Sequence, residues 1–151
     1  MASVRIWQKK RLVLDHLNFR QHQMFKVGTV GVAAVKNRVQ TALGPEDQPA
    51  KPLTKRYAIR KTKLGKGNRR NLTFTGDMLR NLSLRTVSEK AAKAGLTSRK
   101  ERMKAWANQK IEQWLAFSPR NKAAVVEAAR RVMQEAAKRL VVERGLGGKQ
   151  S

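Results

Sequence analysis

The sequence predicts an α+β fold with an N-terminal helix, a small antiparallel sheet formed by a hairpin near residues 82–98, and a long C-terminal helix. Three patterns carry this prediction. Apolar residues recur at helical spacing over residues 21–43, alternate with polar residues over the hairpin, and return to helical spacing over residues 119–143. A chain of 151 residues is long enough for one domain with a core of its own.

Residues 1–20 are predicted to be an N-terminal arm in front of a single domain at residues 21–144. They mix charged with scattered apolar residues, and the stretch RLVLDHL fits either a short strand or an arm that docks on a neighbour. They lack the unbroken apolar core of a signal peptide. No apolar run in the chain approaches the roughly 20 residues that span a bilayer. We therefore expect a soluble protein with no membrane partner.

The first helix is predicted from Gln21 to Leu43 and ends at Gly44-Pro45, because proline cannot continue a helix and restricts the residue before it. Its two glycines and its β-branched valines weaken the helix propensity. The seam predicted to face the core consists of Gly28, Val32, Val35, Val39 and Leu43. The connection GPEDQPAKP carries three of the four prolines, and its Glu46 and Asp47 are interpreted as a solvated turn.

Residues 51–70, KPLTKRYAIRKTKLGKGNRR, are predicted to form a basic loop that holds one short helix. Nine of these residues are basic and none is acidic. The helix is expected over Leu53 to Lys63, with Thr54 as its N-cap and a glycine after its end. We expect Tyr57 and Leu64 to hold this helix against the core, while its arginines and lysines face outward.

Charge is the strongest functional signal in the sequence. Lysine and arginine number 34 against 10 aspartate and glutamate residues, so the formal net charge is +24. Such an excess opposes compactness by self-repulsion, and an anionic partner is expected to offset it. The basic loop suits contact with a phosphate backbone, and its single aromatic residue provides no base-stacking platform. The candidate contact residues are Lys55, Arg56, Arg60, Lys61, Lys63, Lys66, Arg69 and Arg70. The alternative is that these side chains meet acidic faces of neighbouring proteins.

The stretch TGDMLRNLSLRTV leads into the hairpin. Thr75 or Asp77 is expected to cap one helical turn that contains Met78 and Leu79. The alternation that follows predicts two strands joined by a turn at Glu89-Lys90.

Another helix is predicted after the hairpin, with Ser98 as its N-cap and Glu101 in the capping-box position. A short extended segment, WLAFS, follows it. The face expected to pack on the core consists of Met103, Trp106, Ala107, Lys110, Ile111 and Trp114.

Ser118-Pro119 predicts the start of the last helix, because it combines a capping hydroxyl with proline at the first helical position. This helix is predicted to run to about Glu143, and residues 145–151 are expected to form a flexible tail. Its seam is predicted to be Val126, Ala129, Met133, Ala136 and Leu140.

No pattern of catalytic or cofactor-binding residues stands out. The chain has no cysteine, which excludes disulfides and thiolate metal sites. Its two histidines, His16 and His22, lack the i, i+4 spacing of ligands on one helical face. The stretch KLGKGNRR lacks the order of a P-loop, and Trp106, Trp114 and Phe117 are interpreted as core residues. We therefore expect no enzymatic activity, no cofactor and no metal.

The order of these elements resembles the virion-morphogenesis family of tailed bacteriophages, the tail-completion or neck proteins, over residues 21–142. The shared features are a Tyr-x-x-x-Lys stretch, a TG-x-L/ML motif that opens a hairpin, and an aromatic-Leu-x-x-Ser segment before the last helix. The matching positions are Tyr57, Lys61, Thr75, Gly76, Met78, Leu79, Trp114, Leu115, Phe117 and Ser118.

This resemblance implies a small antiparallel sheet packed by a long helix, and a homo-oligomeric ring of commonly about six copies. It implies a place at the head–tail junction of the virion, reached by assembly in the host cytoplasm, with portal, connector and tail proteins as partners. It implies no catalytic residues. In such a ring the basic loop meets either packaged double-stranded DNA or acidic partner proteins.

The alternative function is a free basic nucleic-acid-binding protein of ribosomal or nucleoid type. The two functions differ in self-assembly: a neck protein forms rings or assembles on partners, whereas the alternative stays monomeric and binds duplex tightly at low salt.

Overall fold

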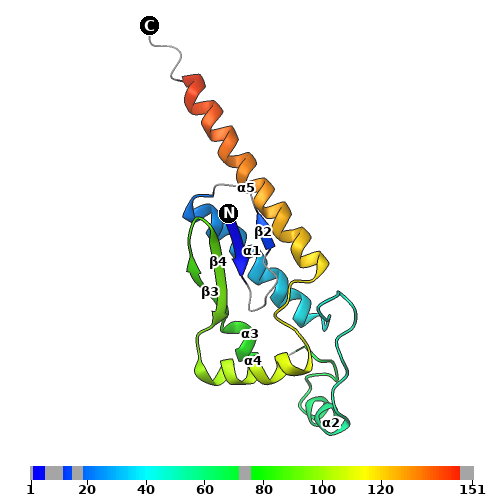
Figure 1. Cartoon of the computed structure of the whole chain (residues 1–151). Coiled ribbons are helices and arrows are strands. Elements are labelled where there is room, and N and C mark those ends of the chain that lie inside the picture. Colours follow the sequence, from blue (N-terminus) through cyan, green and yellow to red (C-terminus); the bar gives the residue numbers. More distant parts are fainter. Residues whose placement is uncertain (1, 6–11, 15–18, 72–75, 147–151) are drawn as a thin grey trace.

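The computed structural model describes residues 2–5, 12–14, 19–71 and 76–146, with side chains from 19–71 and 76–139 (Figure 1). The elements in chain order are β1 (Ala2–Arg5), β2 (Leu12–Leu14), α1 (Gln21–Gln40), α2 (Lys55–Lys63), α3 (Asp77–Arg80), β3 (Leu82–Val87), β4 (Ala91–Leu96), α4 (Arg99–Ile111) and α5 (Pro119–Leu146). The α+β fold is confirmed: the β3–β4 hairpin packs against α1 and the long α5.

The hairpin turn forms where the sequence predicts it. The Ser88 hydroxyl accepts the N–H groups of Lys90 and Ala91, at 3.3 and 3.1 Å. The backbone N–H of Ser88 donates to the carbonyl of Ala91 at 2.7 Å, which closes the turn. One extra residue, Arg85, interrupts the pairing of β3 with β4, because Leu84 lies opposite Ala94 and Thr86 lies opposite Lys93.

The sheet is larger than the predicted hairpin and is mixed. Its strand order is β2-β1-β4-β3, in which β1 runs parallel to β4 and antiparallel to β2. The predicted N-terminal arm therefore supplies two strands of the sheet, and RLVLDHL contains β2. Strands of four and three residues are too short to show a clear alternation in the sequence.

Two glycines of α1 explain how tightly this helix packs. A Cβ at Gly28 would lie 2.8 Å from Ala92 Cβ and 3.0 Å from Leu84 Cδ2 on the sheet. A Cβ at Gly31 would lie 3.2 Å from Phe117 and 3.3 Å from Val125. The glycines that weaken the helix propensity thus allow α1 to approach the sheet and α5 closely.

The core has two parts, and Leu84 and Phe117 pack against both. One part lies where α1, α3, α4 and the hairpin meet, and its large members include Val35, Leu82 and Trp114. The other part joins α1 to α5 and consists of Phe19, Met24, Val27, Ala92, Val125, Ala129 and Val132. Gly28, Val32, Val35 and Val39 are all buried, as the predicted seam of the first helix requires. Leu43, the fifth residue of that seam, lies beyond the end of α1 at Gln40 and is half-buried.

The predicted seam of α5 is correct at Ala129, which is buried, and at Met133, which packs against the core, but is wrong at Val126. The side chain of Leu140 lies outside the described residues. Val125, Ala129 and Val132 are buried, whereas Val126 is exposed. Residues 123–126 are all apolar, so spacing alone does not select one of them. Contact with Gly31 selects Val125. The helix continues to Leu146, beyond the predicted end near residue 143.

The face of α4 was predicted wrongly. Met103 and Trp106 are 62% and 54% exposed, and Ile111 is also exposed. Glu101 and Ala105 are the buried residues of this helix. The reason is that Trp114, which lies beyond the end of α4, fills the core beside Ala105. Its Nε1–H donates to the carbonyl of Ala105 at 3.3 Å.

The start of α5 has the predicted cap and a second one from another part of the chain. The Ser118 hydroxyl accepts the N–H of Asn121 at 3.2 Å. Asp47 Oδ2 accepts the N–H of Arg120 at 2.9 Å. Asp47 lies in the predicted turn, where its backbone N–H donates to the carbonyl of Gly44 at 3.2 Å, and its carboxylate in addition caps a helix more than 70 residues away.

Candidate functional site

The basic loop begins at a fixed point and then leaves the body of the domain. The backbone N–H of Lys51 donates to both carboxylate oxygens of Glu112 at 3.3 Å, and Lys51 Nζ donates to the carbonyl of Ile111 at 3.1 Å. These contacts hold the loop at the C-terminal end of α4. Figure 1 shows α2 projecting from this end of the molecule, away from the sheet.

Most of the predicted contact residues lie on the surface of this projection. Six side chains are exposed: Lys55, Arg56, Arg60, Lys63, Lys66 and Arg69. They belong to α2 and the turn after it, where Gly65 and Gly67 adopt positive φ values of 69° and 65°. The projection therefore presents a concentrated positive surface.

Lys61 is the exception, and the expectation that it faces outward is wrong. Its side chain is 1% exposed. Its Nζ donates to the carbonyl of Arg69 at 2.6 Å and to Oδ1 of Asn71. Burial, with a smaller effect from the charge of Lys66, lowers the pKa of Lys61. The ammonium group organises its own loop and is not presented to a phosphate.

Arg70 is half-buried and also makes contacts within the chain. Its Nε donates to the carbonyl of Lys51 at 2.9 Å, and a terminal nitrogen donates to the carbonyl of Pro52 at 3.3 Å. The side chain thus ties the end of the basic loop to its beginning. This position is better suited to shaping the projection than to binding a partner.

The apolar residues of α2 do not hold it against the core, contrary to prediction. Leu64 is 54% exposed and Tyr57 is also exposed. Ile59, on the same helix, is 58% exposed. The inward-facing position is taken instead by Lys61, which satisfies its charge with oxygens of the loop. As a result α2 presents apolar and basic side chains together.

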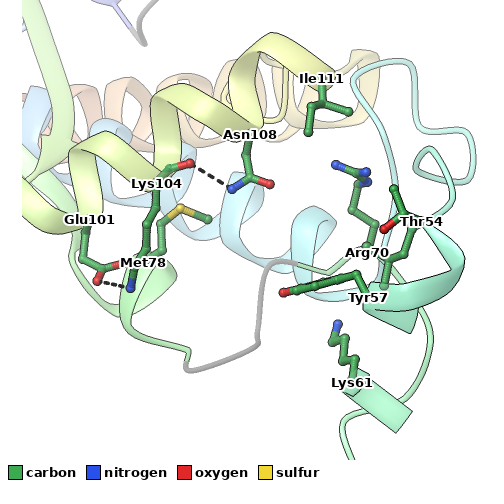
Figure 2. Close-up of a pocket in the computed structure, with 10 residues that line it drawn as sticks. Thr54, Tyr57, Lys61, Arg70, Met78, Glu101, Lys104, Asn108 and Ile111 are labelled. Atoms are coloured by element: carbon green, nitrogen blue, oxygen red, sulfur yellow. Dashed lines mark hydrogen bonds and ion pairs between the residues drawn. The ribbon is translucent and has the colours of Figure 1, made fainter. Parts of the chain in front are cut away.

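A cleft of about 430 Å³ separates α2 from α4 (Figure 2). On the side of α2 it is lined by Leu53, Thr54, Tyr57, Lys61 and Arg70, and on the opposite side by Met78, Glu101, Lys104, Asn108 and Ile111. The Tyr57 hydroxyl points across the cleft in this view. The wall beside α2 is positive, whereas the opposite wall carries the carboxylate of Glu101 together with Lys104.

Glu101 differs from its predicted role. It occupies the capping-box position after Ser98, yet no side-chain cap is formed at this helix start. Its Oε1 accepts from Lys104 Nζ at 2.7 Å, and its Oε2 is buried without a hydrogen-bond partner among the described residues. The carboxylate forms part of the cleft wall because α4 turns this side of the helix inward.

The residues that line the cleft include no histidine and a single carboxylate, that of Glu101. No group of His, Asp and Glu side chains suited to a metal ion occurs in the described part of the chain. The pKa of Lys61 is lowered by burial, and its ammonium is already hydrogen-bonded within its loop. None of the helices in the described ranges is long and apolar enough to cross a bilayer.

The residues that carried the family resemblance fall in two places. Met78, Leu79, Trp114, Leu115 and Ser118 are buried, and Phe117 packs against the core. Gly76 is the residue before α3, at its N-cap, and has a φ of 75°, a conformation that glycine adopts without strain. Tyr57 and Lys61 line the cleft. Thr75 lies outside the described residues.

Sequence reasoning missed Arg38, a buried side chain that forms several hydrogen bonds. It is 3% exposed and donates to Asn121 Oδ1 at 3.0 Å, to the carbonyl of Ala116 at 2.9 Å, and to the carbonyl of Trp114. A lone arginine in a predicted helix carries no signal of burial in the sequence. The side chain joins the end of α1 to the segment that begins α5.

No family model, curated protein or solved structure matches this chain.

Proposed function

We propose that this chain is a structural virion protein of a tailed phage, a neck or tail-completion subunit that forms a ring at the head–tail junction and joins connector to tail. The observation that carries the proposal is the projecting α2, which exposes Ile59 and Leu64 beside its basic side chains. The order of motifs along the chain supports the same function.

The apolar part of α2 favours a protein partner over nucleic acid alone. Ile59 and Leu64 gain little from a phosphate backbone, whereas burial of such side chains between subunits stabilises an assembly. A projecting element is also suited to reach a neighbouring copy around a ring. We therefore assign these apolar residues to contacts between subunits.

The exposed cations of the projection also suit a subunit of such a ring. A closed ring repeats the charge of each subunit around its channel, and contacts to phosphates read no sequence. Weak, sequence-independent contacts of this kind suit DNA that has to pass through the ring. The same cations suit acidic faces of the connector or the tail, because charge complementarity at the rim of an interface sets orientation.

Sedimentation velocity of nuclease-treated protein tests the assembly. We expect the wild type to form a discrete multi-subunit species, and a variant with Ile59→Ser and Leu64→Ser to sediment as a monomer with unchanged circular dichroism. Phe25→Ser is the matched control, because Phe25 is 53% exposed on α1, away from the projection. Assembly that survives the double substitution but fails in the control variant would contradict the proposal.

A free nucleic-acid-binding protein is the second candidate, and the six exposed cations of the projection favour it. It predicts a wild type that stays monomeric at all concentrations and binds duplex tightly at low salt. The same sedimentation experiment, repeated with a short duplex, separates the two candidates.

A further inference from the structure

A second hollow lies on the other side of α4, between this helix and the β3–β4 hairpin, with a volume of about 310 Å³. Its floor is apolar and is formed by Ala94, Leu96, Ala105 and Leu115, which are all buried. We call this hollow the hairpin groove. It shares no lining residue with the cleft beside α2.

Cations surround the hairpin groove. Arg85, Lys93 and Arg102 line it and are exposed, and no carboxylate is among its lining residues. Within the described part of the chain these three side chains form no ion pair. The bulge at Arg85 places this side chain at the groove by adding a residue to β3. The rim is therefore complementary to negative charge.

One further feature indicates an apolar occupant. Trp106 lines the groove and is 54% exposed, with Lys110 Nζ 3.7 Å from its ring centroid. An apolar side chain in the groove would cover this exposed ring.

We propose that the hairpin groove binds a short segment of another protein, in which large apolar side chains are flanked by aspartate or glutamate. The apolar side chains occupy the floor and contact Trp106, and the carboxylates meet Arg85 and Arg102. Duplex DNA offers the negative charge but nothing that covers the apolar floor.

A second copy of this chain is a poorer occupant. The sequence has 10 acidic residues, and its one adjacent pair is Glu46-Asp47. Asp47 is already engaged as the cap of α5. The proposal goes beyond ring formation, since a single subunit contains the whole groove.

The test uses two fluorescent peptides and the full chain. One peptide has a Leu-Phe pair with two acidic residues on each side, and the other has Ser-Ser in place of the pair. By fluorescence anisotropy we expect the wild type to bind the first about tenfold more tightly, the effect of burying one large side chain. Trp106→Ser should remove this preference, and Arg102→Gln should weaken both peptides.

Two controls make the result specific. Lys138→Gln removes the same charge from an exposed position on α5 and should leave both affinities within about twofold, because exposed distant charges are screened. Thr86→Phe fills the groove from an exposed position and should also remove the preference. Equal binding of both peptides by the wild type would overturn the proposal.

Two other outcomes would also overturn it. The first is a preference that persists in both Trp106→Ser and Thr86→Phe. The second is loss of self-association in Trp106→Ser with the peptide preference intact, which would make the groove a contact between copies. The assay is repeated with Ile59→Ser, a substitution that lies outside the groove. This variant separates loss of peptide binding by the groove from loss of ring assembly.

Discussion

Arg38 joins the end of α1 and the loop after it to residues 114–121, which are distant in the sequence. Its guanidinium reaches the loop after α1 at Leu43, the segment before α5 at Trp114 and Ala116, and Asn121 in the first turn of α5. Burial lowers the pKa of Arg38, and the charges of Asp47 and Glu112 oppose this effect. The side chain remains charged at neutral pH because arginine is so basic.

Arg38→Met is expected to lower the free energy of unfolding by about 3 kcal/mol, because it leaves buried carbonyl oxygens without a donor. Chemical denaturation measures the change. Lys26→Met is the control, since the ion pair of Lys26 with Glu135 is exposed, spans 3.5 Å, and contributes about 0–1 kcal/mol. Equal destabilisation of the two variants would show that the hydrogen bonds of Arg38 contribute little.

Asp47 links the stability of α5 to pH. Burial is the largest single influence on this carboxyl and raises its pKa. Hydrogen bonds from Ser118 and the Arg120 N–H, with the charges of Arg120 and Arg38, together outweigh burial, so the pKa of Asp47 is lowered from its ordinary 3.8. A lowered pKa in the folded state means that the unfolded chain binds the proton more readily.

The contribution of Asp47 should therefore be fully present above pH 3.8 and be lost as the pH falls through the folded-state pKa. Asp47→Asn keeps the size of the side chain, and asparagine tolerates the φ of 59° at this position. We expect urea midpoints of wild type and variant to differ at neutral pH and to converge in acid. Curves that stay parallel throughout would rule out this role.

At the scale of the element, α1 shows why propensity and packing conflict. Gly28 and Gly31 lower its intrinsic helix propensity by about 1 kcal/mol each relative to alanine. Both glycines are buried where the helix approaches other elements most closely. The helix is stable because its apolar seam is covered on two sides, by the sheet and by α5.

Gly28→Ala should destabilise the fold by about 1–2 kcal/mol despite the better propensity, because the new Cβ would meet Ala92 Cβ at 2.8 Å and α1 would have to move. Gly31→Ala should cost less, since its nearest atoms, at 3.2 and 3.3 Å, are the ends of the Phe117 and Val125 side chains. Thermal unfolding of the two variants provides the ranking. A Gly28→Ala variant more stable than wild type would refute the close approach.

At the scale of the whole molecule, a net charge of +24 dominates the behaviour in solution. The structure concentrates part of this charge on the projecting α2 and the turn after it. Two of the eight predicted contact residues, Lys61 and Arg70, are used inside the loop. Binding to an anionic polymer should therefore depend on the exposed residues alone.

Replacing Lys55, Arg56, Lys63 and Lys66 with glutamine should lower the affinity for duplex DNA. It should also flatten the dependence of log K on log salt by about 0.9 for each phosphate that the variant no longer neutralises. A matched variant replaces Lys122, Arg130, Lys138 and Arg139, four exposed cations of α5. Equal slopes in the two variants would mean that DNA binds the whole surface diffusely, and an unchanged slope would assign the projection to protein partners.

The sequence by itself determined the helices, the hairpin and the positive charge. Periodicity and capping are local properties, so the seam of α1, the turn at Glu89-Lys90 and the cap at Ser118 follow from neighbouring residues. The basic loop was equally evident as a run of nine cations without an acid. Its short helix at residues 55–63 was predicted within a few residues.

Only the tertiary structure decided which side chains are exposed and can contact a partner. The burial of Lys61 and the outward face of α4 at Trp106 depend on partners that lie outside the helix concerned. The capping role of Asp47 depends on contact between segments that are distant in the sequence. The pairing of β1 with β4 has the same origin. A pattern in the sequence shows which residues share one face of a helix or strand. Whether that face is buried or exposed depends on the other elements that pack against it. The exposed faces are the surfaces proposed for binding.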